Sequence, residues 1–359
     1  MGISFEKINQ LQVPTWNWLK INSVSLDVAE NGLYSYSKEA RLTLPENVRA
    51  ERLFVQPKSA KIPSSMKQNY DFISENHNSS VALTIPEGAL PDSPIIIDYF
   101  LDKDNSLLND YIYIKAEKDS EATVIIKYGG DNCEDAFHSG FTFVEAGENA
   151  KVKLIKVQML PKNALHIDAV AVWSKDRAAA EIILNELGSA RTVASCNILL
   201  KGEQSSGNLG GIYIGKGQEE MDFNYRIELA AKETEGDITV RGTLTDSSKK
   251  TLKSTLDFMT GASGSKGSEE ETVLTLSDKA VNLSAPLLLC GEDDVEGRHA
   301  TSTGRPDSGK LHYLMCRGFD RREAEQLLVE ASFTPLLSKI EIPEIRQEIK
   351  EYIGVSIHG

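Results

Sequence analysis

The chain has 359 residues, of which 40% are hydrophobic and 26% charged, a composition typical of a folded globular protein. Its formal net charge of -14 disfavours non-specific binding to nucleic acid or to an anionic membrane surface, because both depend on clustered Lys and Arg. The apolar runs fall short of the ~18 residues of a membrane helix, and the first residues lack the apolar core of a signal peptide. We therefore expect a cytoplasmic protein whose partners are neither nucleic acid nor membrane.

Residues 1–75 are predicted to form a small helical or mixed cap. This segment is polar and interrupted by prolines, and Trp16 and Trp18 are its most conspicuous apolar residues. We expect these two rings to anchor the cap.

Residues 76–315 are predicted to form a β-rich core. Short β-prone runs, several of which alternate apolar and polar residues, are separated by Gly, Asn, Asp and Ser. Three of these runs share a pattern that begins at Ala122, Ala150 and Ala180, which gives steps of 28 and 30 residues. A period of this size favours a solenoid of stacked coils. A β-sandwich whose strands merely look alike fits the pattern equally well.

Residues 316–359 are predicted to be helical. Asp320 and Glu323 form a capping box that begins a helix, and Pro335 is expected to end or kink it. The apolar stripe of this helix is predicted to consist of Ala324, Leu327, Leu328 and Ala331. A second helix is predicted from Pro343, with Ile345, Ile349 and Ile353 on one face.

The four cysteines, Cys133, Cys196, Cys290 and Cys316, are far apart and form no CxxC pair. This spacing favours neither a disulfide framework nor a self-contained zinc or iron–sulfur site, so we expect reduced, mostly buried thiols. Cys133 and His138 have ligand chemistry, but a buried thiol near a loop histidine is the more ordinary interpretation of such a pair.

Common catalytic motifs such as GxSxG, the P-loop and HExxH are absent from the sequence. The segment richest in possible ligands is EDDVEGRHAT, which runs from Glu292 to Thr301 just after Cys290. Thiolate, carboxylate and imidazole are ligands that iron and zinc accept, and on a strand Cys290, Glu292 and Asp294 would share a face. A solvated turn with His299 as a capping residue is the alternative.

The segment that surrounds EDDVEGRHAT resembles the C-terminal signature of the SufB/SufD family of iron–sulfur cluster assembly scaffold proteins. The similarity is dense over about residues 220–335 and sparse before them. In chain order, the signature is carried by Pro286, Asp293–Val295, His299, Gly304, a strand with Tyr313–Leu314, an Arg317–Gly318 turn and the helix that contains Ala324–Leu328.

The resemblance implies a mainly β fold, a right-handed parallel β-helix (solenoid) with small helical N- and C-terminal regions. It also implies a scaffold rather than an enzyme. Such a scaffold pairs through the β-helix with a SufB-like subunit or a second copy of itself, and it docks an ABC-type ATPase, SufC, on its C-terminal helical region. A transient iron–sulfur cluster would be assembled at the shared interface, without a tightly bound cofactor.

At the level of residues, the histidine that the family places at its dimer interface matches His299, and Cys290 and Glu292 are weaker candidates as ligands. The interface cysteine of SufB proteins would fall at Ala280, so the chain is more similar to SufD. Two further departures are Glu228–Leu229, where a histidine is missing, and Glu269–Glu271, which replaces a Gln/Asn-rich run. The resemblance implies partner-binding residues in the C-terminal region, namely Arg317, Gly318, Leu327, Leu328 and Ala331.

Two other functions remain open. A carbohydrate-active β-helix enzyme could use Asp293 and Asp294 as metal ligands or acid–base groups, although an aromatic content of 7% disfavours a sugar-binding groove. A β-helix interaction protein without cluster chemistry is compatible with Ala280 in place of the thiol.

Overall fold

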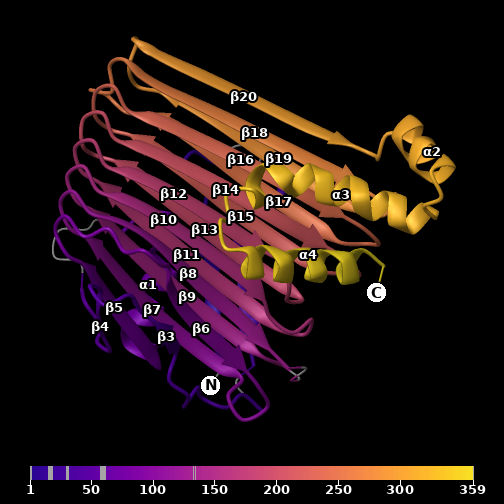
Figure 1. Cartoon of the computed structure of the whole chain (residues 1–359), viewed down its shortest axis with the longest axis horizontal. Coiled ribbons are helices and arrows are strands. Elements are labelled where there is room, and N and C mark those ends of the chain that lie inside the picture. Colours follow the sequence, from indigo (N-terminus) through magenta and orange to yellow (C-terminus); the bar gives the residue numbers. More distant parts are fainter. Residues whose placement is uncertain are drawn as a thin grey trace.

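The structure is a computed structural model that describes residues 2–14, 19–29, 32–56, 62–131, 133 and 135–358. Trp16 and Trp18, the expected anchors of the cap, lie outside the described residues. Over most of the described residues the chain forms two nine-stranded sheets, and from residue 79 onward it passes from one sheet to the other after each strand (Figure 1). The predicted fold, a mainly β protein built as a parallel β-helix with small helical regions near its ends, is confirmed.

From β5 to β20, successive strands along the chain alternate between the two sheets. The first sheet consists of β3 (Arg41–Thr43), β6 (Ile95–Leu101), β8 (Glu121–Gly130), β10 (Lys151–Met159), β12 (Ala179–Glu186), β14 (Ser206–Gly215), β16 (Glu235–Leu244), β18 (Ser265–Thr275) and β20 (Val295–Gly304). The second sheet consists of β4 (Arg49–Glu51), β5 (Ser79–Ile85), β7 (Leu107–Ala116), β9 (Phe137–Ala146), β11 (Leu165–Ser174), β13 (Arg191–Leu200), β15 (Glu220–Leu229), β17 (Lys249–Phe258) and β19 (Val281–Cys290). The remaining elements are β1 (Ile3–Ile8), β2 (Val24–Val28), α1 (Ser64–Asn76), α2 (Ser308–Cys316), α3 (Arg321–Leu337) and α4 (Pro343–His358).

Neighbouring coils stack in parallel register, with a correction to the predicted repeat. Val152 of β10 pairs with Ala122 of β8 and with Ala180 of β12, so the steps are 30 and then 28 residues. Ala150, the residue chosen from the sequence, lies two positions before the true equivalent. A shift of two residues leaves the same side chains on the same face of a strand, so the sequence pattern alone does not detect it.

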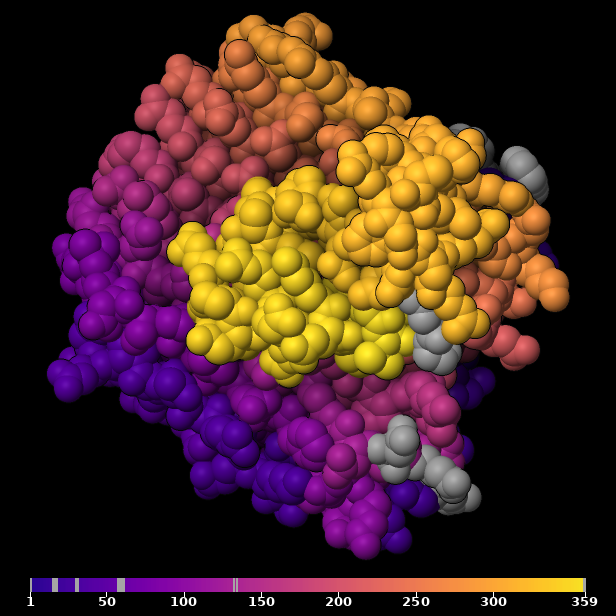
Figure 2. All heavy atoms as spheres, turned by 45° about the vertical axis from the view of Figure 1, so that its right-hand side comes forward, coloured from indigo at the N-terminus to yellow at the C-terminus, as the bar shows by residue number. Residues whose placement is uncertain are grey.

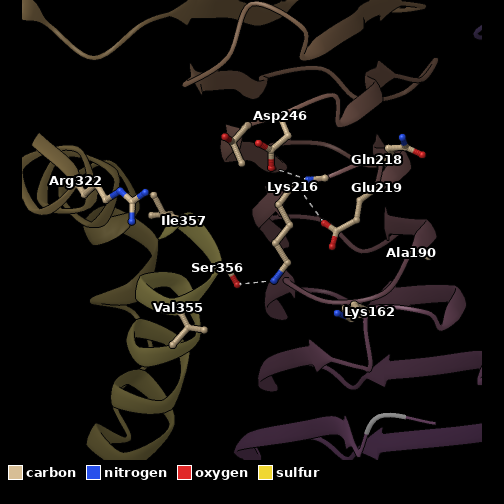
Figure 3. A pocket seen from close by; sticks show the side chains of 12 residues that line it. Lys162, Ala190, Lys216, Gln218, Glu219, Asp246, Arg322, Val355, Ser356 and Ile357 are labelled. Carbon is tan, nitrogen blue, oxygen red and sulfur yellow. Dashed lines mark hydrogen bonds between the residues drawn. The ribbon is translucent and has the colours of Figure 1, made fainter. Parts of the chain in front are cut away.

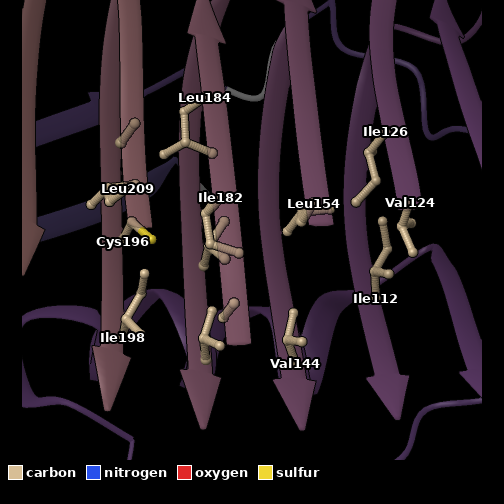
Figure 4. Close-up of a cluster of buried hydrophobic side chains, with 14 of the residues drawn as sticks. Ile112, Val124, Ile126, Val144, Leu154, Ile182, Leu184, Cys196, Ile198 and Leu209 are labelled. Carbon is tan, nitrogen blue, oxygen red and sulfur yellow. The ribbon is translucent and has the colours of Figure 1, made fainter. Parts of the chain in front are cut away.

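Between the two sheets lies a core of inward-facing aliphatic side chains (Figure 4). Val124 of the first sheet lies beside Ile112 of the second, Leu154 of the first lies near Val144 of the second, and all four are fully buried. Complete burial of one such side chain stabilises the folded state by about 1.5–3 kcal/mol. Repetition of this layer from coil to coil holds the two sheets together.

Helices cover parts of the outer faces of both sheets. On the second sheet, α1 packs Tyr70 against Phe141 at a ring distance of 5.0 Å. On the first sheet, α3 and α4 contribute Phe333 and Ile349 to a cluster that includes Ile155 and other outward-facing strand residues. Figures 1 and 2 show these two helices lying together over the sheet. Within the described residues, no helix is long and apolar enough to cross a bilayer.

Several predictions for the C-terminal region are confirmed. The capping box of Asp320 and Glu323 begins α3, and α4 begins at Pro343 with Ile345, Ile349 and Ile353 buried. Among the described residues the last strand ends at Gly304, and α2, α3 and α4 lie within residues 308–358. The division of the chain between residues 315 and 316 stays a prediction.

Three details of that region differ from the predictions. The expected strand at Tyr313–Leu314 is the helix α2, which Asp307 begins by accepting a hydrogen bond from the Lys310 N–H at 2.7 Å. Helix α3 continues two residues beyond Pro335. The predicted stripe of α3 is only partly buried. Ala324 is buried, but Leu327 and Ala331 are exposed, because the face that packs on the sheet is formed by Val329, Phe333, Leu336 and Leu337.

The two ends of the β-helix are finished differently. At the N-terminal end, the short strands β3 and β4 pair antiparallel with β6 and β5 and so cover the first coil. At the C-terminal end, within the part of the chain that the structure describes, β19 pairs only with β17, and β20 pairs only with β18. Along β20, nine of the ten residues are exposed. The described chain therefore closes one end of the β-helix and leaves the other open.

The stacked core can be tested with two leucines. Leu184 is 1% exposed within the core, whereas Leu90 is 67% exposed on the surface. We expect Leu184→Ala to lower the free energy of unfolding by about 2–5 kcal/mol, because it leaves a cavity, and Leu90→Ala to change it by less than about 0.5 kcal/mol. Urea denaturation followed by circular dichroism gives both values, and similar losses for the two variants would contradict the stacked core.

Candidate functional site at the open end of the beta-helix

The last coil presents two unpaired strand edges. β19 and β20 have ten residues each, and each has a neighbouring strand on one side only. Every residue of such an edge carries backbone groups, and those that point away from the sheet have no ladder partner. A long exposed edge is a template for pairing with another chain unless it is protected. This end of the molecule is therefore suited to receive a partner.

His299 lies in the mouth of the open coil. It pairs in register with Glu269 of β18, which is 4% exposed and points into the β-helix. Two residues before His299, a Cβ atom on Gly297 would lie 2.9 Å from the inward-facing side chain of Leu288. Because side chains two residues apart share a face of a strand, His299 also faces inward. It is exposed, since no further coil covers it.

Below His299 is a buried layer of charged and polar side chains. Lys250 forms an ion pair with Glu271, and its ammonium group donates a hydrogen bond to the Ser284 hydroxyl at 3.0 Å. The Ser254 hydroxyl donates to Glu269. Burial lowers the pKa of Lys250, which the Glu271 carboxylate opposes, and burial raises the pKa of Glu269 to about 7. We call this buried layer, which consists of Lys250, Ser254, Glu269, Glu271 and Ser284, the floor of the open coil.

The residues of this floor are not among the predicted site residues. In the sequence, Glu269 and Glu271 stand out only as a departure from the family pattern, and Lys250 carries no such signal. The spacing of two between Glu269 and Glu271 is the signal in the sequence, because it places both carboxylates on one face of a strand.

The turn after Cys290 differs from the strand face suggested by the sequence. β19 ends at Cys290, so Glu292 and Asp294 lie in the turn that leads to β20. A Glu292 oxygen accepts a hydrogen bond from the Gly261 N–H at 3.0 Å, and Asp294 accepts one from the Ser263 hydroxyl at 2.8 Å. The predicted shared face of Cys290, Glu292 and Asp294 is therefore wrong. The two carboxylates fasten this turn to the preceding one.

The candidate ligands of the open coil, Cys290 and His299, lie too far apart to bind one metal ion. Asn282 of β19 donates to Thr303 of β20 at 2.9 Å, which shows which residues of the two strands face each other. By the same register, Pro286 faces His299. Cys290 lies four residues beyond Pro286, about 13 Å along the strand at about 3.3 Å per residue. The thiol and the imidazole therefore do not reach the same ion within one chain, and Ala280 packs against the apolar core.

Two of the predicted partner-binding residues, Arg317 and Gly318, form the turn between α2 and α3, and the other three lie within α3. Gly318 has a φ of +102°, which favours glycine, and the Arg317 guanidinium lies 5.2 Å from the centre of the Tyr313 ring. Leu328 is half-buried. Exposed apolar side chains in these elements are Tyr313, Met315, Phe319 and Leu327. Several exposed apolar side chains in one region are typical of an interaction surface.

A hollow of about 840 Å³ separates α4 from the turns of the β-helix (Figure 3). Lys216 crosses it, with its ammonium group 3.0 Å from the Ser356 hydroxyl and 5.1 Å from the centre of the Tyr352 ring. Glu219 accepts a hydrogen bond from the Lys216 N–H at 3.1 Å, and burial raises its pKa to about 7. The two contacts of the Lys216 ammonium group join α4 to the β-helix, so we assign the hollow a structural role.

Comparison with known proteins agrees with the architecture. Residues 99–332 match the family model described as SUF system FeS cluster assembly, SufBD core domain. The chain belongs to this family. It is 28% identical to the iron–sulfur cluster assembly protein SufD of Bacillus subtilis, over 77% of this chain and 64% of that protein. It is 27% identical to an iron–sulfur cluster assembly SufBD family protein of Pyrococcus horikoshii, over 79% of this chain and 63% of that protein.

The matches to these two relatives therefore span less than two thirds of either relative's length. The SufBD core match begins in β6 and ends in α3, so it includes the open coil with His299 and the turn between α2 and α3.

The buried carboxyl group of Glu269 should make stability depend on pH. Its pKa is about 7 in the folded chain and 4.5 as the ordinary value, so the folded state holds the proton more tightly. The buried Glu269 carboxyl group does not lower the free energy of unfolding below pH 4.5. The loss of stability grows as the pH rises from 4.5 to 7 and reaches about 3 kcal/mol above pH 7. We expect Glu269→Gln to be more stable than the parent at pH 8 and closer to it at pH 4.5. Thermal unfolding at both pH values measures this.

The neighbouring Glu270 is the control, because its side chain is 54% exposed. Glu270→Gln should show no comparable gain at pH 8. If the stability of Glu269→Gln and that of its parent change with pH in the same way, folding does not raise the pKa of Glu269, which would contradict this prediction.

Proposed function

We propose that the chain is a SufD-like scaffold subunit of the SUF system and takes part in iron–sulfur cluster assembly. The observation that carries this proposal is the open last coil, in which two ten-residue edges frame an inward-facing His299 above a buried polar floor. Family membership and the similarity to SufD support it.

In this proposal the open coil pairs with a second β-helix, either a SufB-like subunit or another copy of this chain. A partner with edges of the same kind would satisfy the free backbone groups of β19 and β20 and exclude water from the mouth. Each hydrogen bond formed would add about 0.5–1.5 kcal/mol. His299 would then be enclosed between two coils instead of facing solvent.

The cluster is cargo, and this chain would supply only part of its site. A neutral imidazole of His299 can bind iron through one nitrogen. Cys290 lies about 13 Å along the strand from the residue facing His299, at about 3.3 Å per residue, and Ala280 has no thiol. The thiolates that iron–sulfur clusters require would therefore come from the partner. Glu292 remains a weak candidate, since one of its oxygens already holds the Gly261 N–H.

We further propose that an ABC-type ATPase of the SufC kind docks on α2 and the first turns of α3. Exposed apolar side chains gather there, and α2 begins four residues after β20 ends. A movement of α2 driven by ATP would act directly on the open coil, whereas α3 and α4 are packed against the first sheet. The ATPase would thus be able to open or close the interface.

The other candidate functions have less support. In a carbohydrate-active enzyme Asp294 would have to act on substrate, but it is engaged by Ser263 in a turn. Location in the cytoplasm and the absence of nucleic-acid and membrane partners remain expectations from the net charge and the sequence.

Replacement of His299 tests its assigned role. We expect His299→Ala to retain pairing with the SufB-like subunit and binding of the ATPase, because an exposed side chain contributes little to the fold, but to lose at least tenfold in cluster transfer to an apo-ferredoxin. Cys290→Ala is the matched control in the same coil and should lose less. If His299→Ala transfers clusters as well as the parent does, His299 has no role in the assembly site.

A second test addresses the docking surface. We expect the double substitution Met315→Asp and Leu327→Asp to reduce capture of the purified ATPase at least tenfold, because two charges would be buried without partners. Leu90→Asp introduces a charge at an exposed leucine far from α2 in the sequence and should have no effect. If the double variant captures the ATPase as well as the parent does, and its circular dichroism is unchanged, the ATPase does not bind at α2 and the first turns of α3.

A further inference from the structure

A second buried polar cluster lies inside the N-terminal half of the β-helix, four coils from the open end. His138, expected in a loop, is the second residue of β9, and it stacks on His166 of β11 with ring centres 4.8 Å apart. Every member of the cluster is at most 4% exposed. The cluster consists of Asp110, Tyr128, His138, Lys156, His166, Asp168 and Glu186.

The backbone leaves room for this cluster at Gly140. This residue lies between Asp110 and Asp168 in the register of the second sheet. A Cβ atom at Gly140 would lie 2.7 Å from the Asp168 Oδ1 and 3.1 Å from the Asp110 Oδ1. Any larger residue would displace the two carboxylates, so the glycine allows them to lean toward each other.

A chain of hydrogen bonds sets the orientation of the two imidazoles. The Tyr128 hydroxyl donates to the Asp110 Oδ2 at 3.1 Å, and the Asp110 Oδ1 lies 2.5 Å from the His138 Nε2. The His138 Nδ1 lies 2.7 Å from the His166 Nδ1. With Asp110 as the acceptor at both oxygens, His138 donates from Nε2 and accepts at Nδ1. His166 then donates from Nδ1 and keeps a lone pair on Nε2.

That lone pair points at a carboxylate. The His166 Nε2 lies 3.4 Å from the Glu186 Oε2, and neither atom has a hydrogen-bond partner among the described residues. Two buried acceptors that face each other are unfavourable, because each has lost water without gaining a donor. Asp168 completes the group, since ligand atoms of His166, Asp168 and Glu186 all lie within 4.8 Å of one another.

The cluster also carries excess negative charge. It contains three carboxylates, those of Asp110, Asp168 and Glu186, and a single lysine. The Lys156 ammonium group contacts Asp168 at 2.7 Å and donates to the Thr142 hydroxyl at 3.0 Å. With both imidazoles neutral, two negative charges remain without a counterion in an enclosed interior. Buried charges of this kind are normally paired or coordinate a metal.

We propose that His166, Asp168 and Glu186 bind one divalent transition-metal ion, of the Zn²⁺ or Fe²⁺ kind, inside the β-helix. One imidazole nitrogen and two carboxylate oxygens suit such an ion at about 2.0–2.2 Å, and the 3.4 Å between His166 and Glu186 matches the separation of two ligands on one ion. The ion would balance both negative charges. His138 would hold His166 in its ligand tautomer, as the outer partner of a metal-bound histidine does.

This site is distinct from the proposed assembly site and does not depend on it. Four coils at roughly 4.8 Å separate β11 from β19, about 19 Å in all. The ligands are enclosed, so the ion would enter as the chain folds and would be exchanged only by unfolding.

The test is metal content after refolding. The full chain is denatured with a chelator and refolded with Co²⁺, Zn²⁺ or Fe²⁺ without oxygen, and the bound metal is then measured by mass spectrometry. We expect about one ion per chain, a visible absorption band for Co²⁺ and an unfolding temperature higher than that of the metal-free chain. Glu186→Gln should lose at least nine tenths of the metal, whereas His299→Ala should retain it.

X-ray absorption of the Co²⁺-loaded parent supplies a readout that does not need the Glu186 variant to fold. A first shell of nitrogen and oxygen with an imidazole signature is expected. Sulfur in that shell, less than a tenth of an ion per chain after refolding, or loss of the metal in His299→Ala would each overturn the interior site.

Discussion

The whole molecule depends on one constraint, which is that every backbone N–H and C=O in a stacked sheet needs a strand on each side. Within the β-helix the backbone groups of each coil form hydrogen bonds with those of the coil before it. The parallel register keeps equivalent side chains facing inward. The constraint also means that the stack must be stopped. The described chain stops it at the N-terminal end with β3 and β4 and leaves β19 and β20 without a further coil. Helices α3 and α4 turn back over the first sheet instead of covering that end.

Two polar layers interrupt the otherwise apolar interior, and they differ in access to solvent. The layer around Lys250, Glu269 and Glu271 lies directly under the open coil, where a partner would change its hydration. The layer around His166 and Glu186 is sealed by coils on both sides, so its charges must be balanced within the chain. Buried charges cost stability unless they are paired, and we infer that a subunit interface completes the first layer and a metal ion the second.

The sequence predicts much of the architecture but not the sites. Alternation and a period near 30 residues fit a solenoid and a β-sandwich equally well, and it is the resemblance to the SufB/SufD family that favours the β-helix. The capping box at Asp320 predicts the start of α3. The sequence does not reveal the register at Ala150, because a shift of two residues leaves the same side chains on the same face of the strand. It does not predict α2 either, because the family pattern favours a strand there. The sequence does not predict the interior ligands, because His166 and Glu186 lie on β11 and β12 in different sheets and meet only across the interior of the β-helix. The position of His299 in an inward-facing row was likewise visible only from the register of β18 and β20.

The most direct test of the open coil as a subunit interface is hydrogen–deuterium exchange of β20, followed with the chain alone at high dilution and in its purified complex with a SufB-like subunit or a second copy. We expect the amides of residues 295–304 that point away from β18 to exchange rapidly in the isolated chain and to be protected at least a hundredfold in the complex, while β8 and β10 remain protected in both. If β20 exchanges equally fast in both states, the partner binds elsewhere and the open coil is not the interface.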